Sequence, residues 1–334
     1  MVLFAAGFNA YGQLTFDPGL VTDEPDDLFS FTKIFGAHRI ERPMARLSYT
    51  QVLHDGQMSL AGVGPEDERI WEALETFAVA ANGEILAVQD GLALSPEDAA
   101  QAEKRLVKYA SLRALKAGET QRSWPLAGAV KTIAAFDAGF VILYRDGGVA
   151  TLGDARYEDC LGREATAESP ADEPGAVLDL ADLGEPIMQV SAAGYTLAAL
   201  TESGAVYLWG RPPHGTHRRR QALLTLNRVP NYVEIDGGKD VQDVAVGDSH
   251  VIALTTDGSI FVLGDNTNGQ LGLGKNGIGE VQSWTKAPFH LPDGHEAVAV
   301  AAGPRSSFIL TAARPGDLNS AGTRSAGETE NIDK

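Results

Sequence analysis

The sequence predicts an all-β protein, a closed β-propeller built from repeated strand–turn–strand units. One phrase of strand, tight turn and strand recurs along the 334 residues. The last copy of this phrase is broken, and its missing half stands at the N-terminus. In addition, 37 glycines are spread along the chain, which indicates many turns rather than one flexible linker.

The clearest copy of the phrase is VQDVAVGDSHVIALTTDGSIFVLG, residues 241–264. Its Asp257-Gly258 dipeptide lies between short β-branched runs, which is a strong hairpin signal. Five further copies stand at residues 43–62, 71–89, 130–153, 187–210 and 297–312. Turn dipeptides occupy the matching place in four of them, at 55–56, 82–83, 146–147 and 203–204.

The broken copy, AVAVAAGPRSSFILTA at 297–312, lacks the turn and the second strand. The segment MVLFAAG at 1–7 matches the strand SIFVLG at 259–264 and can supply them. A closed ring explains this split, because pairing the first and last strands removes exposed sheet edges. We therefore expect Val2–Ala6 to pair with the last copy, and residues 1–312 to form a single propeller domain.

The phrase leads into a loop, Gly-x-Asn-x-x-Gly-Gln-Leu, found as GDNTNGQL at 264–271 and as GFNAYGQL at 7–14. Together with the preceding V-x-x-V-x-x-G-x-x-H and D-G-x-I, this pattern resembles the repeat of the regulator of chromosome condensation family, with His250 at the family's histidine position. The resemblance covers about residues 1–312 and implies a propeller that usually has seven blades. Six phrases are readable, so the sequence leaves six or seven blades open.

Two segments fall outside the repeats. SPEDAAQAEKRLVKYASLRALKAG, residues 95–118, predicts an inserted helix, since Ser95 can cap it, Pro96 suits its first turn and Gly118 suits its end. Residues 313–334 lack aromatic side chains and hydrophobic periodicity, which predicts a disordered tail.

The formal net charge of −18 argues against broad nucleic-acid binding, because contacts to phosphates need a concentrated basic face. Cys160 is the only cysteine, so an internal disulfide is impossible and a reducing location in the cytoplasm or nucleus is expected. No apolar run approaches the ~18 residues of a membrane span, and the N-terminus lacks the basic region of a signal peptide.

Motifs with possible chemistry favour structural roles. Gly269–Asn276 imitates a phosphate-binding loop, but Asn276 replaces the required Ser or Thr and no helix follows. His250 is expected to be a hydrogen-bonded residue between blades. Carboxylates cluster only in proline-containing loops, which suits solvated surfaces rather than paired catalytic acids. We therefore expect a protein that is not an enzyme and that holds no cofactor and no metal.

One loop departs from the repeat. GRPPHGTHRRR, residues 210–220, stands in the register of GDNTNGQLGLG and replaces an ordinary turn with prolines, histidines and arginines. A docking loop for an acidic protein partner is one interpretation, because the arginine fork pairs with carboxylates; a loop that balances nearby acidic loops is the plainer one. The expected helix could add a basic face. The candidate partner-binding residues are Arg211, His214, His217, Arg218, Arg219, Arg220, Lys104, Arg105 and Lys108.

These observations predict a non-catalytic propeller that binds proteins through its face loops, as an adaptor or regulatory subunit. The resemblance implies three versions of this role. The first is a chromatin-associated partner of a JmjC-type hydroxylase. The second is an alpha-tubulin-suppressor-type partner of a small zinc protein that serves diphthamide synthesis and tRNA modification. The third, ranked lowest, is guanine-nucleotide exchange on a Ran-type GTPase.

Overall fold

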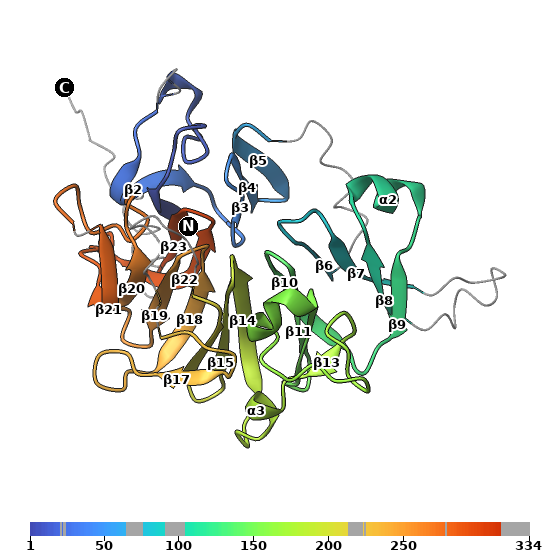
Figure 1. Cartoon of the computed structure of the whole chain (residues 1–334). Coiled ribbons are helices and arrows are strands. Elements are labelled where there is room, and N and C mark those ends of the chain that lie inside the picture. Colours follow the sequence, from blue (N-terminus) through green and yellow to red (C-terminus); the bar gives the residue numbers. More distant parts are fainter. Residues whose placement is uncertain are drawn as a thin grey trace, which may run out of the picture.

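The structure is a computed structural model that describes residues 1–20, 22, 25–64, 76–90, 104–212, 223, 225–277 and 279–314. These residues form six antiparallel sheets arranged around a central axis (Figure 1). This arrangement confirms the predicted β-propeller. The sheet number equals the number of repeat phrases rather than the seven blades expected from the resemblance.

We number the blades in chain order. Blade 1 contains three described strands, β3 (Met44–Ala45), β4 (Tyr49–His54) and β5 (Gln57–Gly62). Blade 2 contains β6 (Thr76–Val79), β7 (Ile85–Asp90), β8 (Lys104–Tyr109) and β9 (Arg122–Pro125). Blade 3 contains β10 (Val130–Phe136), β11 (Gly139–Tyr144), β12 (Val149–Gly153) and β13 (Gly175–Ala176).

Blade 4 contains β14 (Ile187–Ala193), β15 (Thr196–Thr201), β16 (Val206–Gly210) and β17 (Asn231–Val233). Blade 5 contains β18 (Val241–Val246), β19 (His250–Thr255), β20 (Ile260–Asp265) and β21 (Glu280–Lys286). Blade 6 joins both ends of the described chain through β22 (His295–Gly303), β23 (Ser306–Ala313), β1 (Val2–Gly7) and β2 (Leu28–Gly36). Among the described residues, four short helices lie in the loops: η1 (Pro18–Leu20), α2 (Leu112–Ala117), η3 (Ala155–Cys160) and α3 (Leu178–Ala181).

The predicted ring closure is present in blade 6. Strand β1 lies between β23 and β2, with Leu3 opposite Leu310 and Ala5 opposite Phe308. Figure 1 shows this meeting of the blue and red ends of the chain. Leu3 and Ala5 are fully buried, so the N-terminal strand is a central part of the blade rather than an added edge.

Side chains of one blade cover the free inner edge of the next. Gln189 of β14 donates to the carbonyl of Val244 and accepts from its N–H, at 2.9 and 3.3 Å. The equivalent residue of β18 is Asp243, whose carboxylate accepts from the N–H of Val300 in β22 at 2.7 Å. Unpaired strand edges invite association with other chains, and these bonds remove that opportunity inside the channel while fixing the blade order.

Apolar clusters fill the spaces between blades. Residues of blades 4 and 5, such as Leu208 and Val251, share one cluster, and four similar clusters join blades 3 and 4, 5 and 6, 6 and 1, and 2 and 3. Among the described residues, no cluster joins blade 1 to blade 2. Between these two blades, the Arg46 guanidinium donates a hydrogen bond to the carbonyl of Val79 at 3.4 Å.

The predicted helix is largely wrong. Residues 104–109 are strand β8, which pairs with both β7 and β9, whereas only α2 at 112–117 is helical. Ser111 caps α2 and Gly118 ends it with a φ of 69°, so the expected stop is confirmed. The signals at Ser95, Pro96 and Gly118 favoured a longer helix, but pairing on both edges and burial of Leu106 and Tyr109 override that local preference. Residues 95–103 lie outside the described residues.

A second difference concerns Asn82-Gly83. The other turn dipeptides join the second and third strands of a blade, but this one joins the first and second strands, β6 and β7. Asn-Gly suits any tight hairpin turn, so the dipeptide does not specify which turn of the blade it forms.

The repeated Gly-x-Asn-x-x-Gly-Gln-Leu phrase builds one loop geometry in blades 5 and 6. The Asn266 side chain accepts from the N–H of Leu271 at 2.9 Å, and Asn9 does the same for Leu14 at 2.8 Å. The glutamine of each copy accepts from the backbone two residues before it. Gly272 of this loop has a φ of 65° and lies so close to Phe31 that a Cβ would approach the ring to 2.4 Å.

Candidate protein-interaction face

The turns between the first and second strands of all six blades meet at one mouth of the central channel. They enclose a cavity of about 140 Å³. Its lining includes Arg46, Val79, Asp137, Gly194, Asp248 and Pro304, one residue from each blade. We call the end of the ring that carries this cavity the channel face. The loops between third and fourth strands, including the one that begins at Arg211, lie at the same end of their blades.

Two carboxylates stand in this mouth. The N–H of Asp137 donates to the carbonyl of Gly194 at 2.8 Å, and the N–H of Asp248 donates to the carbonyl of Pro304 at 3.2 Å. Burial, with a smaller effect from the charge of Asp137, raises the pKa of Asp248 to about 7, against an opposing effect from Arg305. Burial also raises the pKa of Asp137. Burial in the mouth therefore favours the neutral form of both carboxyl groups, and a nearby cation would favour their charged form.

Close approach of the backbone holds these turns together. Gly194 has a φ of 55°, and a Cβ on it would lie 2.7 Å from the carbonyl oxygen of Asp248. Glycine is the residue that tolerates both this left-handed conformation and this contact. The position of Asp248 thus depends on the adjoining turn of blade 4.

Arginines and aromatic rings surround the mouth. Tyr157 of η3 stacks on Tyr195, with ring centroids 5.0 Å apart. The guanidinium of Arg211 lies 6.0 Å from the centre of the Tyr157 ring, and that of Arg305 lies 5.7 Å from the centre of the Phe8 ring. Cation–π contacts of this kind orient a guanidinium without neutralising its charge. The channel face therefore combines an acidic centre with a cationic and aromatic rim.

The structure describes four of the candidate partner-binding residues. Arg211 is half-buried, and its N–H donates to the carbonyl of Tyr195 at 2.9 Å. His214, His217, Arg218, Arg219 and Arg220 lie outside the described residues. Their role in binding stays a prediction.

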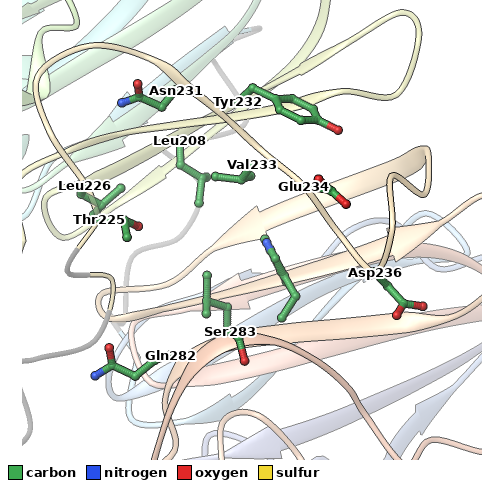
Figure 2. Close-up of a pocket in the computed structure, with 12 residues that line it drawn as sticks. Leu208, Thr225, Leu226, Asn231, Tyr232, Val233, Glu234, Asp236, Gln282 and Ser283 are labelled. Carbon is green, nitrogen blue, oxygen red and sulfur yellow. The ribbon is translucent and has the colours of Figure 1, made fainter.

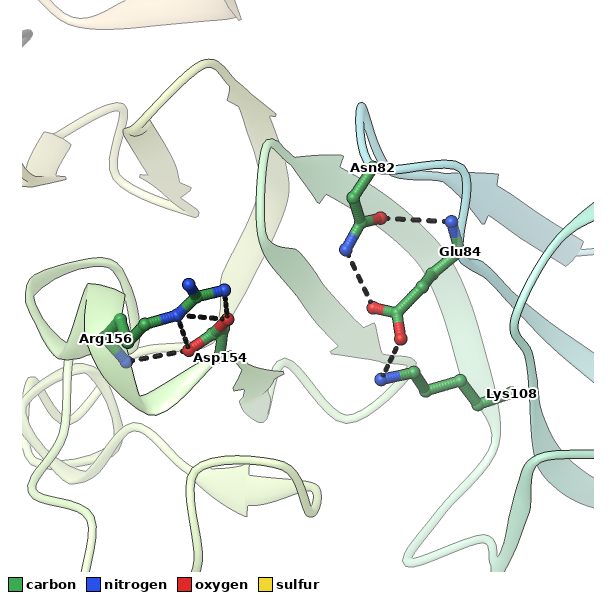
Figure 3. A network of polar contacts seen from close by, with 5 residues as sticks. All are labelled: Asn82, Glu84, Lys108, Asp154 and Arg156. Atoms are coloured by element: carbon green, nitrogen blue, oxygen red, sulfur yellow. Dashed lines mark hydrogen bonds and ion pairs between the residues drawn. The ribbon is translucent and has the colours of Figure 1, made fainter.

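The other candidates, Lys104, Arg105 and Lys108, belong to strand β8. Because successive side chains of a strand point to opposite faces, Arg105 and Lys108 do not share the basic helix face that the sequence predicts. Arg105 donates to the Ser123 hydroxyl at 2.7 Å. Lys108 forms an ion pair with Glu84 at 2.8 Å. Figure 3 shows this pair, with Asn82 bonded to Glu84 and a separate bidentate pair of Arg156 with Asp154.

His250 is confirmed as a residue between blades. It is fully buried, and its Nε2 lies 3.3 Å from the carbonyl oxygen of Ser306 in blade 6. Burial lowers its pKa to about 4, so the ring is neutral at physiological pH. Cys160 is also fully buried, and burial raises its pKa to about 12, which is the reverse of what a nucleophilic thiol needs.

Sequence reasoning missed Asp137 and Asp248. Both follow the first strand of a repeat phrase, at the place where other copies have Gly194 or Pro304. A charged residue at a turn position otherwise held by glycine or proline was the available signal.

Among the described residues, no three His, Cys, Asp or Glu side chains gather to hold a metal ion. Within the same part of the chain, no helix has the length and apolar character to cross a bilayer.

A ring of six sheets with loops gathered at one channel mouth defines a β-propeller that presents contact residues on a rigid scaffold. Two family models of the regulator of chromosome condensation (RCC1) repeat match residues 241–270 and 257–310. Residues 241–310 therefore carry repeats of the regulator of chromosome condensation type.

Known proteins share parts of the sequence and the whole fold. The mouse regulator of chromosome condensation is 37% identical over 134 residues, which are 40% of this chain and 30% of that protein. The human E3 ubiquitin-protein ligase HERC2 is 35% identical over 138 residues, 41% of this chain but 3% of that protein. The crystal structure of Prp20p from Saccharomyces cerevisiae matches with a TM-score of 0.65 at 12% identity and covers 96% of this chain and 94% of that one. This set of similarities is consistent with a protein-interaction or regulatory role.

Proposed function

We propose that this protein is a non-catalytic adaptor that binds a partner protein across its channel face. The observation that carries this proposal is the convergence of turns from all six blades on one mouth with a cationic and aromatic rim. Binding residues commonly lie on loops held by a rigid scaffold. Two buried groups with shifted pKa values, His250 and Cys160, are occupied within the fold.

The rim favours a partner with an acidic surface. Arg211 and Arg305 contact aromatic rings, and among the described residues neither forms an ion pair with a carboxylate. Arg218, Arg219 and Arg220 follow Arg211 in the same loop of the sequence. Several charge-assisted hydrogen bonds would form together on docking, each contributing ~1.5–3 kcal/mol. The acidic centre at Asp137 and Asp248 would accept one basic side chain of the partner.

The test is a loop variant in the full chain. Changing Arg218, Arg219 and Arg220 together to Ala should weaken binding to the main native partner at least about tenfold, while the melting temperature stays nearly unchanged. Arg39→Ala is the control. Arg39 is exposed, and it lies beside Asp55, which belongs to the turn between β4 and β5. That turn is at the end of blade 1 opposite to the channel face. Undiminished affinity of the folded triple variant would remove this loop from the site.

Guanine-nucleotide exchange is a second candidate. The regulator of chromosome condensation is among the matched proteins, and Prp20p is described by its binding to Gsp1p and histones. The match to the mouse protein spans under a third of its length, so its activity comes to this chain only as a candidate. Release of labelled GDP from a Ran-type GTPase is the assay, and we expect no acceleration.

The identity of the partner stays a prediction. A JmjC-type hydroxylase on chromatin and a small zinc protein of diphthamide synthesis are the two kinds that the family resemblance implies. Affinity purification of the full chain from native extract, followed by mass spectrometry, distinguishes them. Recovery of neither kind with the wild type would contradict both.

A further inference from the structure

A second surface lies away from the channel mouth, in the outer groove between blades 4 and 5. It forms a cavity of about 500 Å³. Strand β17 and the residues around it form one wall, and β21 forms the other. Figure 2 shows Leu208, Leu226 and Val233 on one side, with Gln282 and Ser283 across from them.

The floor of this groove is apolar. Leu208, Leu226 and Leu263 reach the cavity although they are nearly fully buried. Trp284 and Val233 are half-buried above them. Leucine, valine and tryptophan facing an open cavity of this size are typical of a binding site rather than of a closed core.

The rim of the groove is acidic at one end. Glu234 and Asp236 line the cavity there, as Figure 2 shows. Lys239 pairs with Asp236 and Asp257, at 3.0 Å each. Glu234 is exposed, and no described residue forms an ion pair with it. Among the described lining residues none is cationic, so the unbalanced charge of this end is negative.

An exposed ring completes the acidic end. Tyr232 is 53% exposed, and its ring packs edge-on against Tyr207 with centroids 6.0 Å apart. A lysine or arginine beside Glu234 would also lie within reach of an aromatic face, which attracts cations.

The strands that flank the groove are the outermost of their sheets. β17 pairs with β16 and β21 pairs with β20, and no described strand pairs with the outer edge of either. Outer edges offer backbone hydrogen bonds to an extended chain, while the pockets beside them select side chains. The groove thus suits an extended segment more than a folded surface.

We propose that the groove between blades 4 and 5 binds an extended segment of a partner protein in which a lysine or arginine lies next to an aromatic or branched aliphatic residue. The apolar side chain enters the floor at Leu208 and Trp284, and the cation meets Glu234. This site is independent of the proposed channel-face function, since it uses the outer strands β17 and β21 rather than the turns at the channel mouth, and an acidic rim rather than an arginine rim.

The test starts from a random peptide library displayed on phage and selected on the full chain. Enriched peptides should carry Lys or Arg within two positions of an aromatic or branched aliphatic residue. The Kd of labelled peptides, measured by fluorescence anisotropy, should rise at least about tenfold for Glu234→Lys, and also for Trp284→Ala. Glu119→Lys is the matched control, because it makes the same charge change on an exposed residue of blade 2, and it should leave the Kd unchanged.

Three results would overturn the proposal. Selected peptides without a cation, or peptides that bind both groove variants as tightly as the wild type, would show that the groove is not the site. The third concerns the chain's own arginines. The Arg218, Arg219 and Arg220 triple Ala variant should bind the peptides with unchanged affinity. Tighter binding by that variant would assign the groove to the chain's own basic segment instead of a partner. Thermal melting of each variant confirms that it is folded.

Discussion

Removing the Asp243 carboxylate should destabilise the ring, because this side chain joins three parts of it. Asp243 lies in β18, and its Oδ2 accepts from the N–H of Val300 at 2.7 Å and from the Arg42 guanidinium at 2.9 Å. Its side chain is 4% exposed, whereas that of Arg42 is 48% exposed. One carboxylate oxygen therefore connects blade 5, blade 6 and the segment that leads into blade 1.

The magnitude follows from what Asp243→Ala leaves behind. The N–H of Val300 would be buried without an acceptor, which costs about 1–3 kcal/mol. Arg42 would return to water, so the lost ion pair contributes up to ~1 kcal/mol. The free energy of unfolding should fall by about 1–4 kcal/mol. Asp243→Asn keeps an oxygen for the Val300 N–H, so its loss should be the smaller one.

Urea unfolding followed by the fluorescence of the tryptophans measures these changes. Asp240→Ala is the control, because Asp240 is exposed three residues earlier and should change the free energy of unfolding by less than about 0.5 kcal/mol. A double-mutant cycle of Asp243→Ala with Arg42→Ala isolates the ion pair. If Asp243→Ala unfolds at the same urea concentration as the control, the inferred role of this carboxylate is wrong.

Three further predictions concern the closure, one glycine and the channel mouth. Deleting residues 1–8 should cause a large loss of thermal stability, because it removes strand β1 from the middle of blade 6. Deleting residues 315–334 should change the melting temperature little. Equal effects of the two deletions would contradict a ring closed by β1. Gly272→Ala should lower the melting temperature more than Gly274→Ala. Both glycines have positive φ, but only a Cβ on Gly272 would meet an aromatic ring, that of Phe31. The reverse order would show that the Phe31 ring moves aside freely. Because the folded-state pKa of Asp248 is raised to about 7 from 3.8, the folded protein binds more protons than the unfolded chain between these values. The contribution of Asp248 to stability is therefore fully present below pH 3.8 and is lost as pH rises through the folded pKa of about 7. Its replacement by Asn should raise the melting temperature at pH 8 and change it least at about pH 3, and an identical shift at both pH values would refute the raised pKa.

The repeat phrases predicted the architecture because each combines several signals of one structure. Alternating apolar residues, a turn dipeptide and a loop glycine agree in the phrase at 241–264, and the structure has β18, β19 and β20 there. The broken copy predicted that Val2–Ala6 pairs within the last blade, and in the structure Val2 lies opposite Thr311. Local patterns that agree with one another specify a fold more strongly than any single propensity.

The segment at 104–109 was predicted wrongly for a physical reason. Its sequence, KRLVKY, suits a basic helix face as well as a paired strand. Contacts with strands that are distant in the sequence determine which of the two forms. Lys108 pairs with Glu84 across the sheet, and Arg105 reaches Ser123. Such contacts depend on which strands meet, and that cannot be read from local spacing.

The channel mouth was not predicted for a related reason. Asp137 and Asp248 are 111 residues apart in the printed numbering, and each alone is an ordinary turn residue. The effect of Asp137 on the pKa of Asp248 arises only when the ring brings their turns together. The basic loop at 210–220 was visible in the sequence because its departure from the repeat is local.

The pairing of β1 with β23 sets an order of events during synthesis. Val2 accepts a bond from Thr311, which is 309 residues later in the chain. At ribosomal rates of 5–20 residues per second, β1 exists for roughly 15 to 60 s before its neighbour in blade 6 is made. During that interval β2 is the strand of the same blade with which it can form a hairpin. Strands β1 and β2 are thus made before the strands of the other blades, yet their own blade is complete only when β22 and β23 exist. A nascent chain should need protection of Leu3 and Ala5 from aggregation until β23 has been made.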